Sequence, residues 1–160
     1  MPTARRSRTI PVPAAALWEI VRDPHHLPRW WPRVERVEDV DGGAFTEVMR
    51  TAKGKVVRAD FDVVRADDDA RALTWSQRVQ GTPFGRILSS SETHLELSRP
   101  PGQGGVEAEL GAGAGASTHV TIEMRQKLTG FLPHFGSRMV RRAAASTIEE
   151  ALDGLERLGG

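Results

Sequence analysis

The chain has 160 residues, with 22 basic and 21 acidic side chains, a formal net charge of +1 and no cysteine. This length suits one domain with a hydrophobic core and is short for two, so we predict a single domain over residues 1–160. The balanced charge predicts no nucleic-acid binding, and the lack of cysteine excludes disulfides and thiolate catalysis. It also fits a reducing cytoplasm, which is the location we expect. No apolar run is long enough for a transmembrane helix, so we expect no integral membrane association.

The first 32 residues predict a strand and two short helices separated by prolines. Arg6–Val12 has the pattern of a strand that ends at Pro13. The stretch PAAALWEIVRD carries apolar residues at helical spacing after a proline that a first helical turn tolerates, so it predicts a short helix. The prolines at 24, 28 and 32 then limit HHLPRWW to another short helix or turn.

Six strand-like runs follow, and short turns separate most of them. The connections carry Asp-Gly-Gly at Asp41, Lys-Gly at Lys53 and three aspartates from Asp67, all of which are common in turns. Consecutive strands with short connections predict an antiparallel meander. The predicted strands are Val34–Val40, Phe45–Thr51, Lys55–Arg65, Ala72–Val79, Arg86–Ser98 and Ser117–Leu128.

Two segments near the C-terminus complete the predicted architecture. The glycine-rich segment that includes Gln103–Ala116 predicts a long hairpin loop, because the strands on both sides of it still need partners. From about Phe131 to Leu158, apolar residues recur at steps of three and four, which predicts one long helix ended by the final glycines. The residues of this predicted apolar stripe are Phe135, Met139, Ala143, Ile148, Leu152 and Leu155.

These elements predict an α+β fold. One curved, seven-stranded antiparallel sheet cannot cover its own apolar face, so the long C-terminal helix must lie across it. The two short helices after the first strand then close one end. This arrangement leaves a cavity between the sheet and the helix.

Alternation along the strands indicates which side chains face that cavity. In the strand before the glycine-rich loop, Leu95 and Leu97 require the odd positions from residue 87 onward to face inward. Ser89, Ser91 and Thr93 then share this face. A buried hydroxyl without a partner costs about 1–3 kcal/mol. The three hydroxyls therefore either bond to backbone or buried water, or line a wet or ligand-filled cavity.

The same alternation turns Phe61, Trp75 and Gln77 inward. Glu47 alternates with Phe45 and could also face inward. A buried carboxylate there would have a raised pKa and could serve as an acid or a base. On an edge strand the same side chain would be exposed to water.

The histidines and tryptophans before residue 32 raise two further hypotheses. Trp30 and Trp31 are adjacent and cannot point the same way, so we expect one in the core and one nearer the cavity entrance, where tryptophan suits a ligand wall. The alternative is that both only plug one end of the sheet. His25 and His26 diverge on a turn, so we expect no metal site and no cofactor. No nucleophile-elbow sequence occurs, and we assign no catalytic residue.

Three parts of the chain carry a resemblance to a known family. They are TIPVPAAALWEIVRDPHHLPRWWPRV, QRVQGTPFGRI and the long C-terminal helix. Together they resemble the START-like (SRPBCC) superfamily and, within it, the polyketide cyclase/dehydrase and lipid-transport group. The resemblance covers nearly the whole chain and implies a helix-grip fold that binds hydrophobic or aromatic ligands between sheet and helix. Some members are aromatases or cyclases, and others carry lipids, quinones or hormones.

The catalytic positions of the cyclases in this group fall, by register, on Val34, Phe61, Val63 and Arg78. Of these, Arg78 alone matches the polar residue that the resemblance implies. The other three positions are apolar, which favours a binding protein or a different chemistry over polyketide cyclisation.

We therefore predict a protein that binds a small hydrophobic, aromatic or lipid-like ligand, as a monomer or a homodimer. Two alternatives stay open. One is an aromatase/cyclase or dehydratase-like enzyme, and the other is a protein-interaction module of the co-chaperone or toxin type. The predicted ligand wall consists of Trp30, Trp31, Phe61, Trp75, Gln77, Ser89, Ser91, Thr93, Phe135 and Met139.

Overall fold

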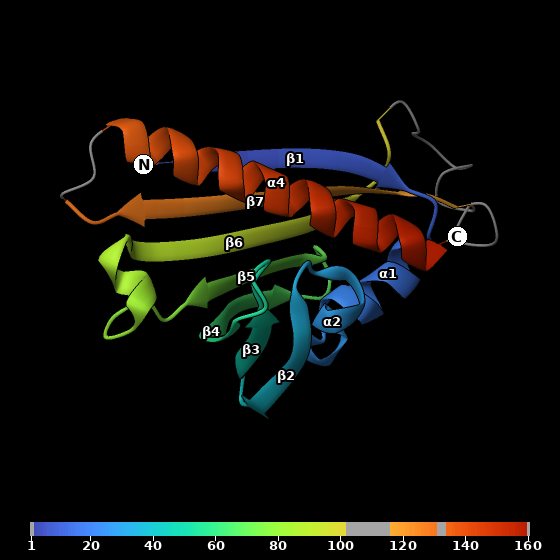
Figure 1. Cartoon of the computed structure of the whole chain (residues 1–160). Coiled ribbons are helices and arrows are strands. Elements are labelled where there is room, and N and C mark those ends of the chain that lie inside the picture. Colours follow the sequence, from blue (N-terminus) through green and yellow to red (C-terminus); the bar gives the residue numbers. More distant parts are fainter. Residues whose placement is uncertain (1, 102–115, 131–133, 160) are drawn as a thin grey trace.

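The computed structural model describes residues 2–101, 116–130 and 134–159, and only the backbone of residues 134 and 135. Residues 103–115 of the predicted loop lie outside the described residues. Figure 1 shows the arrangement of the elements. In chain order they are β1 (Thr3–Ile10), α1 (Ala14–Val21), the 3-10 helix η1 (Pro24–His26), α2 (Leu27–Trp30), β2 (Val34–Asp41), β3 (Ala44–Arg50), β4 (Val56–Asp67), β5 (Ala72–Gln77), the 3-10 helix η2 (Pro83–Arg86), β6 (Leu88–Ser98), β7 (Thr118–Leu128) and α4 (His134–Gly159).

The strands form one antiparallel sheet of seven in the order β1-β7-β6-β5-β4-β3-β2. Strands β2 to β7 follow one another as the predicted meander, and β1 pairs with β7. Gly42 and Gly43 join β2 to β3 with φ angles of 55° and 91°, which glycine adopts readily because it has no Cβ. The predicted fold is confirmed.

Helix α4 lies across one face of the sheet, and its C-terminal end meets α1 and α2 (Figure 1). Its buried side chains are Ala144, Ile148, Ala151, Leu152 and Leu155. The predicted apolar stripe was wrong at Ala143, which is exposed because the buried stripe passes through its neighbour Ala144. The C-terminal half of α4 therefore contributes most of the helix's packing.

Gly154 allows α2 and α4 to approach each other closely. A Cβ at this position would contact the carbonyl oxygen of Trp30 and lie 2.8 Å from its Cα. Because the neighbouring atoms are backbone, they could not move aside without shifting α2. The absence of a side chain at Gly154 therefore lets the two helices pack closely in the part of the fold where the adjacent tryptophans lie.

A register shift in β6 changes which of its side chains face inward. Leu88 pairs with Leu128, but Ser90 pairs with Lys127, so one residue is inserted between them. The bulge buries Leu88 and leaves Ile87 50% exposed. The predicted inward orientation of the odd positions therefore holds from Ser91 onward and was wrong for residue 87.

Arg8 links β1 to the outer surface of α4. Its guanidinium donates to Asp153 Oδ1 at 2.6 Å and to Glu149 Oε2 at 2.7 Å, and it lies 3.2 Å from Glu156 Oε2. The hydrogen bonds to Asp153 and Glu149 hold the pKa of Arg8 above its usual value. The edge strand and the acidic half of the helix are thereby joined through one side chain.

Candidate ligand-binding site

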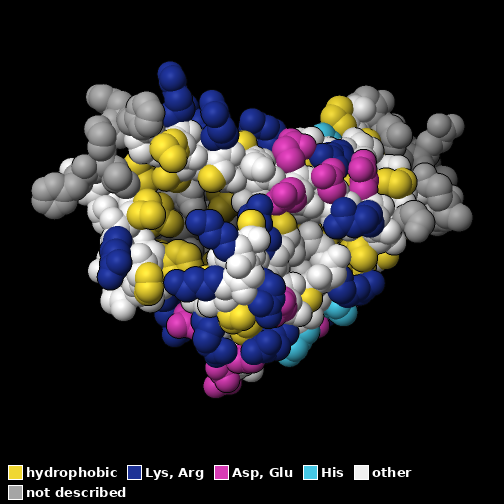
Figure 2. Space-filling view, in the orientation of Figure 1, with side chains coloured by type: hydrophobic (Ala, Val, Ile, Leu, Met, Phe, Trp, Pro, Cys, Tyr) yellow, Lys and Arg dark blue, Asp and Glu magenta, His cyan; other side chains and the backbone are white. Residues whose placement is uncertain are grey.

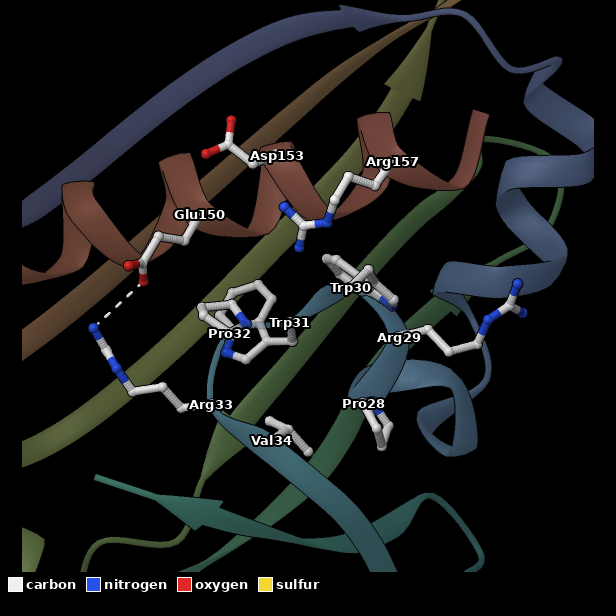
Figure 3. Close-up of a pocket in the computed structure, with 10 residues that line it drawn as sticks. All are labelled: Pro28, Arg29, Trp30, Trp31, Pro32, Arg33, Val34, Glu150, Asp153 and Arg157. Atoms are coloured by element: carbon white, nitrogen blue, oxygen red, sulfur yellow. Dashed lines mark ion pairs between the residues drawn. The ribbon is translucent and has the colours of Figure 1, made fainter. Parts of the chain in front are cut away.

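A groove with a volume of about 430 Å³ lies between α4 and the connection from α2 to β2 (Figure 3). Arg33 crosses it to Glu150, with 3.5 Å between the guanidinium nitrogen and the carboxylate oxygen. Arg33 has a φ of 65°, uncommon for a residue other than glycine, where the chain turns from α2 into β2. The groove is lined by Pro28, Arg29, Trp30, Trp31, Pro32, Arg33, Val34, Glu150, Asp153 and Arg157.

Three tryptophans connect this groove to the inner face of the sheet. Trp30 and Trp31 meet edge to face with ring centroids 5.4 Å apart, and Trp31 meets Trp75 in the same way at 5.5 Å. We expected one tryptophan in the core and one nearer the cavity entrance, and both rings are buried, with Trp30 1% and Trp31 8% exposed. Both rings nevertheless line the groove.

Phenylalanine rings continue the apolar surface across β3 and β4. Phe45 and Phe61 are directly paired, and their rings stack with centroids 5.3 Å apart and planes 9° from parallel. Phe61 in turn pairs with Gln77 at the end of β5. The space enclosed beside Phe45 and Trp75 is only about 10 Å³, comparable to a single water position. The side chains here pack closely.

The predicted hydroxyl row divides at the bulge of β6. Ser91 and Thr93 are 5% and 3% exposed, and Ser91 Oγ accepts a hydrogen bond from Gln126 Nε2 at 3.3 Å. Ser89 is half-buried and donates to the carbonyl oxygen of Lys127. The bulge therefore separates Ser89 from the two buried hydroxyls that the row was predicted to include.

A second, mainly apolar pocket of about 220 Å³ lies between η2, β6, β7 and the first half of α4. Figure 2 shows hydrophobic side chains gathered with Lys and Arg near this end of α4, whereas acidic side chains gather near its other end. Met139 is 63% exposed and does not line this pocket, and the side chain of Phe135 lies outside the described residues. The lining residues are Phe84, Ile87, Leu88, Met124, Gln126, Val140, Ala143, Ala144 and Thr147.

Two charged residues singled out in the sequence, Glu47 and Arg78, face opposite ways. Glu47 is 1% exposed on the inner face, and burial raises the pKa of its carboxyl from 4.5 to about 8. Arg78 is exposed and donates two hydrogen bonds to Asp62, at 2.7 and 2.6 Å. The arginine that matched the cyclase pattern therefore faces away from the interior.

Sequence reasoning did not select Gln126 or Leu88 for the site. Continuing the alternation of Ile122 and Met124 by one step would have reached Gln126. Leu88 gave no such signal, because the bulge that turns it inward depends on pairing with β7.

Among the residues that the structure describes, no group of three or more His, Asp or Glu side chains is arranged to hold a metal ion. The carboxylate of Asp23 lies near the rings of both adjacent histidines, His25 and His26. Its Oδ1 accepts from the backbone of His25 at 3.0 Å and lies 2.9 Å from the ring Nδ1 of His25. No helix among the described residues is long and apolar enough to cross a membrane.

A seven-stranded antiparallel sheet gripping one long C-terminal helix, with short helices after the first strand, defines the helix-grip fold of START-like proteins. The model of the family described as polyketide cyclase/dehydrase and lipid transport matches residues 1–159, and this chain belongs to that family. No match is found among curated proteins.

Solved structures of low sequence identity share the fold. The di-domain ARO/CYC BexL from the BE-7585A biosynthetic pathway has a TM-score of 0.75 and 19% identity, over 98% of this chain. This chain spans 46% of the length of that two-domain protein. A protein from Thermus thermophilus has a TM-score of 0.67 and 23% identity, over 98% of this chain and 95% of its own. A START superfamily protein from Mycobacterium smegmatis has a TM-score of 0.69 and 14% identity, over 96% and 94%.

Proposed function

We propose that the protein binds a small hydrophobic, ring-containing or lipid-like molecule between the sheet and α4. The observation that carries this proposal is the continuous aromatic surface that leads from the groove to the inner face through Trp30, Trp31 and Trp75. Aromatic rings present a large apolar area to a ligand, and a fold with one helix across a curved sheet offers that area on its inside. Membership of a family described by lipid transport as well as cyclisation supports the same function.

The apolar pocket beside Met124 and Gln126 is the entrance that we propose for this ligand. Its volume of about 220 Å³ is below the usual range for drug-sized ligands, which begins near 300 Å³. A larger ligand would therefore have to extend inward over Ser91 and displace packed side chains. The groove at Trp31 is larger but carries several charged side chains, which suits an apolar ligand less well.

The test is a titration with N-phenylnaphthylamine, an uncharged fluorescent probe, read by probe fluorescence and by quenching of tryptophan emission. Ala143→Phe places a ring in the apolar pocket and is expected to weaken probe binding at least about tenfold. Ser146→Phe is the matched control, because Ser146 is exposed on the same helix and lines none of the described pockets. Equal affinities of the wild type and both variants would contradict the proposed entrance, and absence of wild-type binding would contradict the function.

A second function, an aromatase/cyclase or dehydratase-like enzyme, is favoured by one specific observation. Glu47 is a buried carboxyl with a raised pKa on the inner face, which is the kind of group that can supply or accept a proton near neutral pH. Turnover of a poly-β-ketone that is lost in Glu47→Gln would support the enzyme. Binding of the substrate without turnover would support the carrier.

A further inference from the structure

Several buried side-chain polar atoms of the described residues, Trp30 Nε1 among them, have no hydrogen-bond partner, and two of these atoms belong to strand residues of the inner face. They are Glu47 Oε2 and Gln77 Nε2, and both atoms are buried. Buried polar atoms in folded proteins almost always have a partner, so each exception needs a physical reason. Glu47 is 1% exposed, which excludes bulk water as its regular partner.

The phenylalanine stack separates these two side chains. Phe45 pairs with Phe61, and Phe61 pairs with Gln77, while Glu47 lies two residues beyond Phe45 on the same face of β3. Strand spacing and rise per residue put the α-carbons of Glu47 and Gln77 roughly 12 Å apart. A flat ligand lying on the stacked rings would therefore have one of the two polar groups at each of two opposite edges.

The surroundings of Glu47 offer no compensating charge. Its directly paired neighbours are Val37 on β2 and Ala59 on β4, and both are apolar. Charged groups of these strands pair elsewhere, as Arg36 and Arg58 do with Glu38. The ion pair of Arg33 and Glu150 crosses the groove beside α4. Burial is the sole cause of the raised pKa of Glu47, so none of these charges contributes to it.

These surroundings determine what Glu47 can offer a ligand. With a pKa of about 8 the carboxyl is protonated at pH 7 and can donate a hydrogen bond. The unpartnered atom of Gln77 is an amide nitrogen and is also a donor. Two donors at the two ends of an aromatic surface call for two acceptor atoms. An anionic ligand would bring a negative charge to an interior where Glu47 already resists ionisation.

We propose that Glu47 and Gln77 are the polar contacts of the ligand, and that the ligand is a fused-ring molecule with uncharged carbonyl oxygens on two opposite edges. This inference rests on the proposed function and specifies its ligand class. Access is consistent with it, because Ser76 pairs with Glu92 and one further step of that register brings Gln77 level with Ser91, beside the apolar pocket. A ligand entering there would meet Gln77 first, then the phenylalanine stack, then Glu47.

The experiment compares anthraquinone with anthracene, two probes with the same three fused rings that differ in two carbonyl oxygens. Quenching of tryptophan emission gives both affinities at pH 7, for the wild type and for Glu47→Leu, Glu47→Gln and Gln77→Leu. We expect Glu47→Leu and Gln77→Leu each to weaken anthraquinone binding about fivefold or more and to leave anthracene binding unchanged. Glu47→Gln retains a donor and should bind anthraquinone as the wild type does. Thermal unfolding of each variant verifies that it is folded.

A second arm varies the pH and the charge of the probe. Wild-type affinity for anthraquinone should fall between pH 7 and pH 9.5, because the ionised carboxylate can no longer donate, and Glu47→Gln should not show this fall. Anthracenecarboxylate should bind more weakly than anthraquinone to the wild type at both pH values.

The outcomes separate this inference from the proposed function. Equal anthraquinone affinities in the wild type, Glu47→Leu and Gln77→Leu would overturn the inference, even where Ala143→Phe still blocks binding and the proposed function stands. Tighter binding of anthracenecarboxylate than of anthraquinone would overturn the ligand class. If the wild type binds none of the three probes and not N-phenylnaphthylamine either, both proposals fail.

Discussion

On the inner face, burying the carboxyl of Glu47 carries a desolvation cost that its neighbours do not offset by hydrogen bonding. Glu47 is enclosed by strand neighbours that cannot hydrogen-bond to it through their side chains, and its Oε2 has no partner among the described residues. Replacing such a group by an apolar residue of similar size often stabilises a protein. A buried Glu47 without a partner therefore agrees with the ligand contact that we propose for it.

The first prediction concerns the pH dependence of stability. In the unfolded chain Glu47 ionises near pH 4.5, and in the folded protein near pH 8. Between these values the folded state holds a proton that the unfolded state has lost. The free energy of unfolding should therefore fall as pH rises, by up to about 1.4 kcal/mol per pH unit. Glu47→Gln should lack this component, so the difference between wild type and variant in urea unfolding should change between pH 5 and pH 8. A constant difference would contradict it.

The second prediction concerns Gly154. An alanine inside a helix ordinarily stabilises it relative to glycine by about 0.5–1 kcal/mol. At residue 154 the added methyl group would overlap the backbone of Trp30, so we expect Gly154→Ala to destabilise by about 1–3 kcal/mol. Gly130→Ala is the control, because a Cβ there meets no atom within 4 Å. Denaturant unfolding of both variants decides the sign, and a stabilised Gly154→Ala would show that α2 and α4 can separate freely.

At the scale of secondary-structure elements, α4 has two halves with different roles. Its C-terminal half buries Ile148, Leu152 and Leu155 against the core and carries the acidic residues that contact β1. Its first half borders the apolar pocket through Val140 and Ala143. The helix is thus anchored at one end and lines the proposed ligand entrance at the other.

The third prediction concerns the Arg8 network that anchors this helix. A single exposed ion pair contributes little, but Arg8 is partly buried and lies at hydrogen-bond distance from three carboxylates, those of Glu149, Asp153 and Glu156. We expect Arg8→Met to reduce stability by about 1 kcal/mol at low salt, with a smaller loss in about 1 M salt because the charges are screened. Arg5→Met is the control, since Arg5 is exposed and lies 4.0 Å from Glu123. Equal losses in the two variants would contradict a special role for Arg8.

At the scale of the whole molecule, the interior formed by the described residues is closely packed. The cavity beside Phe45 and Trp75 is about 10 Å³, whereas the pocket at the first half of α4 is about 220 Å³. Binding over the inner face therefore requires side chains to move, and a ligand that binds only the folded state must stabilise the whole protein.

The fourth prediction follows from this linkage. At a free probe concentration of about one hundred times its dissociation constant, the folded state should gain about 2.7 kcal/mol, which raises Tm by several degrees for a domain of this size. At the same probe concentration Ala143→Phe should lose about half of this gain or more, since tenfold weaker binding leaves about 1.4 kcal/mol, and Ser146→Phe should keep all of it, as measured by thermal unfolding with N-phenylnaphthylamine. A Tm that rises equally in both variants would place the binding site elsewhere.

Local pattern in the sequence determined the order of elements, the meander and the inward face of most strands. Alternation and turn chemistry act over a few residues, so they can be read from the chain without knowing the partners. The alternation correctly predicted that Trp75, Ser91 and Thr93 face inward, and it indicated Glu47 as a possible buried carboxyl.

Tertiary structure alone decided the features that depend on distant partners. Pairing with β7 places the bulge that buries Leu88 and separates Ser89 from the buried hydroxyls. Met139 is exposed in the first half of α4, whereas both adjacent tryptophans are buried at the other end, where α2 approaches Gly154. Whether a polar atom such as Glu47 Oε2 finds a partner depends on every element that surrounds it. No local pattern in the chain contains that information.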